Sequence, residues 1–236
     1  MDRFGQWKVE RVLNEDASVF VCRSDSGQSA VAKIPRRGSL SLAYRIEEEN
    51  RRVLAYEARQ LSTWRGIPGV VALIEWQPDA RVPYLVTELL GASLEDSIPE
   101  FGLEPNECFH VIDDVASALE RIHALGGAHY DLKPDNILQH PAGGWRLIDP
   151  SPADMATEDY GPSRAVGAQR DLIALARVFI TAYTGAMETE LPDEVIDSVL
   201  DLPEGERWLG VLRKLSRGGS SATDARRAAK AVLRTL

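Results

Sequence analysis

The sequence changes character near residue 90, and this change limits the folds that the chain can adopt. Before it, short apolar runs are separated by polar turns. These runs predict five strands, at residues 7–13, 19–23, 30–34, 70–76 and 84–88. After it, apolar residues recur three and four positions apart, as on one face of a helix. The sequence therefore predicts an α+β chain in which the strands come first and the helices follow.

Helical patterns appear once among the strands and repeatedly after them. Residues 39–64 are rich in Leu, Ala, Glu and Arg, which favours one or two amphipathic helices. Pro105 stands where a first-turn proline belongs, and the helix that it begins should end at Gly126. Further helices are predicted at residues 171–184, 208–215 and 223–236. Gly91, between the two halves, is the predicted hinge.

Length and composition indicate a chain that buries a core without covalent help. It has 236 residues, of which 44% are hydrophobic and 27% charged, close to the globular average. Cys22 and Cys108 lie far apart and form no C-x-x-C pair, so neither a zinc site nor a disulfide framework is expected. The cysteine usage favours a reducing, cytoplasmic location.

Charge and hydropathy exclude two classes of partner. The net charge of −9 disfavours a broad contact with the phosphate backbone of nucleic acid. No stretch approaches 18 consecutive apolar residues, so no membrane span is expected. Residues 1–10 lack the basic and apolar regions of a signal peptide.

One polar segment combines an acid, a base and an amide on a predicted loop. It reads H-Y-D-L-K-P-D-N at residues 129–136, directly after the predicted helix that ends at Gly126. Asp149 follows thirteen residues after Asn136, at the end of the apolar run 145–148. About 100 residues upstream, A-V-A-K at residues 30–33 ends a predicted strand.

This ordered set resembles the eukaryotic-like protein kinase family. Residues 129–136 resemble its H-R-D-x-x-x-x-N loop, Asp149 the aspartate of D-F-G, and Lys33 the lysine of V-A-I-K. The resemblance implies one bilobal domain over residues 1–236. Its N-lobe, residues 1–90, would hold five antiparallel strands and one main helix, and residues 91–236 a mostly helical C-lobe. The compact size is similar to bacterial or phage-encoded members.

The resemblance also assigns roles to the polar residues of the loop. Asp131 would accept the proton of the acceptor hydroxyl, and Lys133 would face the transferred phosphoryl group. Asn136 and Asp149 would hold Mg²⁺. The form with Lys133 is typical of Ser/Thr members, so the implied reaction is phosphoryl transfer from ATP to a protein Ser/Thr hydroxyl.

The nucleotide contacts follow from the same resemblance. Lys33 would grip the α and β phosphates and pair with Glu57, with Glu49 as the alternative partner. The remaining contacts would surround adenine, with Val21 and Ala32 above the base, Leu138 below it, Thr87 beside it, and the backbone of Glu88 to Leu90 at its edge.

The phosphate-covering loop departs from the family pattern. The stretch that should read G-x-G-x-x-G, residues 13–21, contains no glycine, and Glu15 and Asp16 add negative charge. Three interpretations follow: the loop stands away from the nucleotide, binding is weak, or the chain is a pseudokinase that acts as a scaffold. A small-molecule kinase of the same fold is a further alternative.

The segment after Asp149 departs as well. Tyr130 replaces the arginine of H-R-D, Pro150-Ser151 replaces Phe-Gly, and no A-P-E follows. Only 21 residues separate Asp149 from Asp171, which resembles the aspartate that braces the catalytic loop. We therefore expect a shortened activation segment without a phosphate switch.

Charge asymmetry suggests how a substrate could dock. Residues 188–206 hold eight acids and no base, which indicates either a solvated face or a docking surface for a basic protein substrate. Residues 36–40 read R-R-G-S-L and resemble a phosphorylation site at Ser39, although a mobile connection explains the pattern as well.

Overall fold

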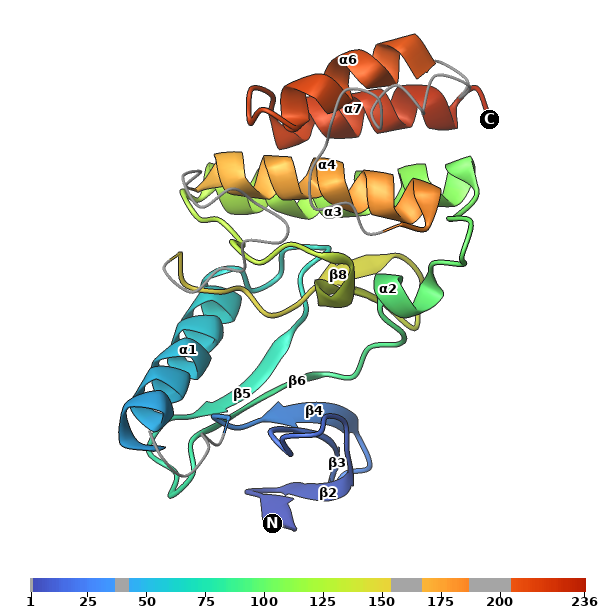
Figure 1. Ribbon diagram of the computed structural model, residues 1–236. Coiled ribbons are helices and arrows are strands. Elements are labelled where there is room, and N and C mark those ends of the chain that lie inside the picture. Colours follow the sequence, from blue (N-terminus) through green and yellow to red (C-terminus); the bar gives the residue numbers. More distant parts are fainter. Residues whose placement is uncertain (1, 37–42, 154–166, 187–204) are drawn as a thin grey trace. The chain divides into compact units, whose positions relative to one another are not determined.

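The computed structural model describes residues 2–36, 43–153, 167–186 and 205–236 (Figure 1). Contacts divide the chain into two compact units. The first contains the residues up to Gly66 together with Val71–Leu89, and the second contains Ile67–Val70 and Leu90–Leu236. The first is rich in strands and the second in helices, as the α+β prediction expected.

The first unit consists of an antiparallel sheet and one helix. Its elements are β1 (Arg3–Phe4), β2 (Trp7–Val12), β3 (Val19–Ser24), β4 (Ser29–Lys33), α1 (Ala43–Thr63), β5 (Leu73–Gln77) and β6 (Tyr84–Glu88). The strands lie in the order β1-β2-β3-β4-β6-β5. All five predicted strands are present, and the two-residue β1 is an addition. The fourth begins at Leu73, since Val70 belongs to the second unit, where it forms a parallel bridge with Leu147.

The two faces of the sheet have different neighbours, since successive residues of a strand point to opposite sides. One face carries an apolar cluster. Its buried members are Phe4, Trp7, Phe20, Cys22, Ala30, Ala32, Ile34, Tyr84 and Val86. On the other face, Leu85 of β6 packs against Leu54 and Ala58 of α1. This contact attaches the helix to β6, which lies next to the edge strand β5.

The second unit is mostly helical. Its elements are α2 (Leu94–Ser97), α3 (Pro105–Ala124), the 3₁₀ turn η1 (Pro134–Asn136), β7 (Ile137–Gln139), β8 (Trp145–Leu147), α4 (Ala168–Thr184), α6 (Gly205–Leu215) and α7 (Ala222–Leu233). Helices α3 and α4 lie side by side (Figure 1). Phe109 of α3, Phe179 of α4 and Trp208 of α6 join the three helices, with ring centroids 4.8–5.3 Å apart. In the described part of the chain, no helix combines the length and hydropathy that a membrane span needs.

Helix α4 is the central helix of this core. A helix that is apolar on all sides is a buried one, and α4 buries residues on every side along most of its length. It ends at Gly185, whose backbone is left-handed with φ of 75°. A Cβ atom at this position would lie 2.3 Å from the carbonyl oxygen of Glu100. Both the conformation and the close approach require glycine.

Gly185→Ala should therefore destabilise the second unit. We expect a loss of about 3 kcal/mol or more in the free energy of unfolding, because left-handed strain and a backbone clash add together. The matched control is Gly126→Ala, since Gly126 has the same φ of 75° but a Cβ atom there would meet nothing within 4 Å. The control should lose only about 1–2 kcal/mol. Chemical denaturation measures both, and equal losses would contradict the role of the Glu100 contact.

Candidate active site

The first unit holds a buried ion pair at the end of β4. Lys33 Nζ lies 2.9 Å from Glu57 Oε1 of α1, and the two side chains are only 12% and 8% exposed. Glu49, the alternative partner, is exposed. Breaking such a pair leaves an uncompensated buried charge, which typically costs about 3–5 kcal/mol. The pair therefore holds the ammonium group in one place.

The strand register decides which residues share the face of Lys33. Lys33 is paired with Val19, and Val31 with Val21, so these four residues point to one side of the sheet. Ala32 is paired with Phe20 and lies in the apolar cluster of the opposite face. The sheet thus cannot present Val21 and Ala32 to the same ligand, which corrects the expectation for Ala32. Val31 lies on the face of Lys33 instead. The sequence already indicated this, because residues two positions apart on a strand share a face, and Val31 is two positions before Lys33.

The other predicted adenine contacts of this unit lie on β6. Thr87 is buried and paired with Val31, so it belongs to the same face as Lys33. Glu88 is tied to Ala72 twice: its backbone N–H donates to the Ala72 carbonyl, and its Oε1 accepts from the Ala72 N–H at 2.9 Å. These bonds fix the end of β6.

In the second unit, one buried carboxylate holds the loop that begins at His129. Asp171 is fully buried in the first turn of α4. Its Oδ2 accepts from the backbone N–H of His129, and its Oδ1 accepts from that of Tyr130, both at 2.8 Å. The ring of His123 on α3 lies 2.9 Å from Oδ2. Hydrogen bonds to a charged acceptor are the stronger kind, so Asp171 anchors the loop to two helices.

The side chains of this loop converge on Asp131. Asn136 Nδ2 donates to Asp131 Oδ2 at 2.9 Å and to its carbonyl oxygen at 2.7 Å. Lys133 Nζ lies 3.4 Å from the same Oδ2. The structure therefore brings together the three predicted site residues of this loop and places a cation beside the carboxylate. This arrangement orients Asp131 and neutralises nearby negative charge.

Asp149 follows β8 and is tied to the loop by neighbouring residues. The ring of His129 binds the carbonyl of Ile148 at 2.8 Å, and Ser151 N–H donates to the carbonyl of His129. Asp149 and Tyr130 adopt left-handed backbones, with φ of 58° and 66°. Such conformations are uncommon for residues with a Cβ atom, and they persist where surrounding contacts hold them.

Leu90 and Leu138, the two predicted adenine contacts of this unit, are half-buried. Leu138 lies on β7 and forms an isolated antiparallel bridge with Ser93. The Gly91 N–H donates to the Gln139 carbonyl at 2.7 Å, so the segment after Leu90 is bound alongside β7.

Tyr130 has a contact that the sequence did not predict. Its hydroxyl accepts from the backbone N–H of Gly167 at 3.2 Å, directly before α4. The sequence indicated only that an arginine was missing at this position. The structure shows that a neutral hydroxyl there binds the far end of the segment that follows Asp149.

Asn136 and Asp149 fit a magnesium ion by their donor atoms. Because the amide nitrogen of Asn136 donates to Asp131, its amide oxygen is the atom that can bind a cation. Mg²⁺ prefers oxygen ligands, and it is typically bound by one or two protein groups together with phosphates and water. The described residues contain no group of three or more His, Cys, Asp or Glu that could hold a metal by themselves.

Some predicted features lie outside the described residues. These are Ser39, most of the acidic stretch at 188–206 and most of the short segment between Asp149 and Asp171. The docking surface and the phosphorylation site therefore stay predictions.

A carboxyl pair lies next to the loop. The hydrogen bond between Glu95 and Asp135, together with burial and the charge of Asp135, raises the pKa of Glu95 to about 7. Its ordinary value is about 4.3. The folded chain therefore binds a proton that the unfolded chain has lost over this pH range. The contribution of Glu95 to stability is complete below the ordinary pKa and is lost as the pH rises through about 7.

Glu95→Gln should flatten the pH dependence of stability. We expect the variant to match the native chain at pH 5 and to be more stable than it at pH 8, because glutamine cannot ionise. Urea denaturation at both pH values measures this. Glu100→Gln, another exposed glutamate of this unit, should keep the native profile. A Glu95→Gln variant that loses as much stability as the native chain between pH 5 and pH 8 would contradict the shared proton.

Comparisons with known proteins agree with this geometry. The chain matches the family described as "Protein kinase domain" over residues 15–170. It is 30% identical to the serine/threonine-protein kinase AfsK of Streptomyces griseus over 190 residues, which cover 71% of this chain and 22% of that protein. The AfsK of Streptomyces coelicolor is 31% identical over 190 residues, which cover 71% of this chain and 23% of that protein.

A third relative matches over a shorter stretch. MAP kinase-interacting serine/threonine-protein kinase 1 of Xenopus laevis is 35% identical over 124 residues, 48% of this chain and 29% of that protein. The chain thus spans less than a third of the length of these relatives. The matched residues include Lys33, Glu57 and the whole 129–136 loop. The chain belongs to the protein kinase family, and these relatives are serine/threonine kinases.

Proposed function

We propose that this chain transfers the γ-phosphoryl group of ATP, with Mg²⁺, to a serine or threonine hydroxyl of a protein. The observation that carries the proposal is the geometry around Asp131, whose Oδ2 contacts both the Asn136 amide and the Lys133 ammonium. Phosphoryl transfer requires little covalent chemistry from the protein, so positioning and charge neutralisation are the main tasks.

The loop residues take the roles that their contacts suit. Asp131 accepts the proton of the acceptor hydroxyl and orients it, while Asn136 holds the Asp131 carboxylate through its amide nitrogen. Lys133 neutralises charge that develops on the transferred group. Bound Mg²⁺ would neutralise phosphate charge, with Asn136 and Asp149 as its protein ligands.

The first unit supplies the nucleotide contacts of this proposal. Lys33 is assigned to the α and β phosphates, because Glu57 holds its ammonium in a fixed position. Val21, Val31 and Thr87 share the face of Lys33 and are assigned to adenine. In the second unit, Leu90 and Leu138 are assigned to the same base.

A pseudokinase is the second candidate, and the glycine-free turn at residues 13–21 is the observation that favours it. Glycine allows backbone N–H groups to approach phosphates closely. The two candidates agree on nucleotide binding and differ in turnover. The small-molecule kinase differs from both in its acceptor, which would not be a protein.

Asp131→Asn should lower turnover by about 10² to 10⁴, the usual contribution of a general base, and leave ATP affinity nearly unchanged. The measurement is transfer of label from γ-labelled ATP to generic proteins, a cell lysate and the chain itself. Asp79→Asn is the control, because Asp79 is exposed in the turn between β5 and β6.

Each result of this assay selects one candidate. Protein labelling that the Asp131 variant loses supports the proposed kinase. Labelling that persists in the variant contradicts the role of Asp131. ATP binding without label on any protein favours the pseudokinase, or a small-molecule acceptor if ATP is still consumed.

Activity without an activating phosphate is the second part of the proposal. The bond from the Gly167 N–H to the Tyr130 hydroxyl suits a segment that is held without a phosphate. Tyr130→Phe removes this bond and keeps the ring. Turnover should fall by up to about tenfold, the value of one neutral hydrogen bond, and phosphatase treatment should leave native turnover unchanged. Loss of native turnover after phosphatase treatment would contradict a phosphate-independent segment.

The acidic stretch at residues 188–206 bears on the choice of substrate. The acidic composition of residues 188–206 favours a basic protein substrate. Comparing otherwise identical acceptor peptides with arginine or alanine beside the serine tests this preference.

A further inference from the structure

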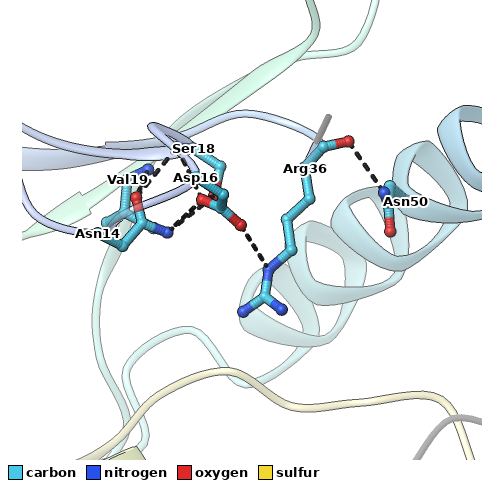
Figure 2. Close-up of polar contacts among 6 residues, drawn as sticks. All are labelled: Asn14, Asp16, Ser18, Val19, Arg36 and Asn50. Carbon is cyan, nitrogen blue, oxygen red and sulfur yellow. Dashed lines mark hydrogen bonds and ion pairs between the residues drawn. The ribbon is translucent and has the colours of Figure 1, made fainter. Parts of the chain in front are cut away.

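The turn between β2 and β3 is closed by its own hydrogen bonds. Figure 2 shows Asn14, Asp16, Ser18 and Val19 gathered around one point. Asn14 Oδ1 accepts from the backbone N–H of Ser18 at 3.0 Å and from that of Val19 at 2.9 Å. The Ala17 N–H donates to the Asn14 carbonyl at 3.1 Å. Three successive backbone donors of the turn therefore bind Asn14.

Asp16 reinforces this arrangement. Its Oδ1 accepts from the Ser18 N–H at 3.1 Å, from the Ser18 hydroxyl at 2.6 Å and from Asn14 Nδ2 at 2.6 Å. Asn14 Nδ2 also donates to Ser18 Oγ at 2.9 Å. Ser18 itself is only 2% exposed, whereas Asp16 lies at the surface.

The turn is also anchored to the rest of the first unit. Val19 is the strand partner of Lys33, and the Ile34 N–H donates to the Ser18 carbonyl at 2.9 Å. Asp16 Oδ2 lies 3.4 Å from Arg36 Nε, and the Arg36 carbonyl accepts from Asn50 Nδ2 of α1 at 2.9 Å (Figure 2). The closed turn thus lies beside Lys33 and is linked to α1.

Adjacent backbone N–H groups in a turn form an anion-binding concavity. In protein kinases, the loop between these strands covers the nucleotide phosphates. Here the amide oxygen of Asn14 accepts from the adjacent N–H groups of Ser18 and Val19, the kind of donor pair that could otherwise bind a phosphate oxygen. The carboxylate of Asp16 adds negative charge at the same point. A bound phosphate would have to displace the Asn14 amide oxygen and overcome the repulsion of the Asp16 carboxylate.

We propose that the Asn14 side chain occupies the anion-binding position of this turn, so that the turn does not hold the phosphates of a bound nucleotide. The inference rests on the proposed function, in which Lys33 binds ATP. Nucleotide affinity then comes from the adenine contacts, Lys33 and the metal. Asn14 is a residue that limits phosphate affinity, and removing its side chain should increase that affinity.

The test compares a ligand that has phosphates with one that has none. The probes are a non-hydrolysable ATP analogue with Mg²⁺, and adenosine, each titrated by calorimetry. Asn14→Gly frees the N–H group of Val19 and leaves that of Ser18 bound only to Asp16 Oδ1. It should lower the dissociation constant of the analogue about threefold to tenfold, because the freed donor can bind a charged oxygen. The dissociation constant of adenosine should change less than about twofold, since adenosine has no phosphate to bind these donors.

Two further variants distinguish the effect of freed backbone N–H groups from the effect of a more flexible backbone. Asn14→Ala removes the same amide without adding glycine, so it should also lower the dissociation constant of the analogue. Ala17→Gly adds glycine at a residue whose φ is already 51° and keeps every side chain of the network. It should leave both dissociation constants unchanged. Thermal unfolding verifies that each variant is folded.

The contrary outcomes are distinct. Unchanged or weaker binding of the analogue by both folded Asn14 variants overturns the proposal, as do equal shifts for the analogue and adenosine. The proposal is also overturned if Ala17→Gly lowers the dissociation constant of the analogue as much as the Asn14 variants do. Backbone flexibility alone would then explain the stronger binding. If neither the native chain nor any variant binds the analogue, the proposed function fails together with this inference.

Discussion

The loop that carries the predicted catalytic residues depends on one buried carboxylate. Asp171 contributes no chemistry of its own, but it accepts the backbone N–H groups of His129 and Tyr130 and contacts His123. A fully buried charge is tolerated only when its hydrogen bonds are satisfied. The first turn of α4, the end of α3 and the loop are therefore held together. The position of Asp131 follows from this anchor.

In the first unit, a strand and a helix together hold a charged group in place. Leu85 packs α1 against the sheet. Because α1 is held there, its Glu57 can pair with Lys33 and fix the position of the ammonium group. The same strand end carries the turn closed by Asn14, because Val19 and Lys33 are strand partners. One short region thus combines a fixed cation with a turn whose backbone donors are already bound.

Much of this could be predicted from the sequence, because the signals were local. Strands and helices follow from hydrophobic periodicity, and the loop residues follow from a compact motif. Ala32 was assigned to the wrong face, although alternation from Lys33 pointed to Val31. Glu57 was predicted as the partner of Lys33, with Glu49 as the alternative, and the structure has the Glu57 pair. The missing glycines were visible, but the partners of the Ser18 and Val19 N–H groups were not.

The sequence by itself determined the α+β class, the family resemblance and the residue types of the candidate site, because these depend on order and spacing along the chain. The resemblance also predicted that Lys33 pairs with Glu57 and that Asp171 braces the loop, but only the tertiary structure decided which atoms meet. The Tyr130 hydroxyl binds Gly167, 37 residues away, and Asp171 reaches back 41 residues to Tyr130. Such contacts depend on helix packing and strand register, and their directions are set only when the core forms.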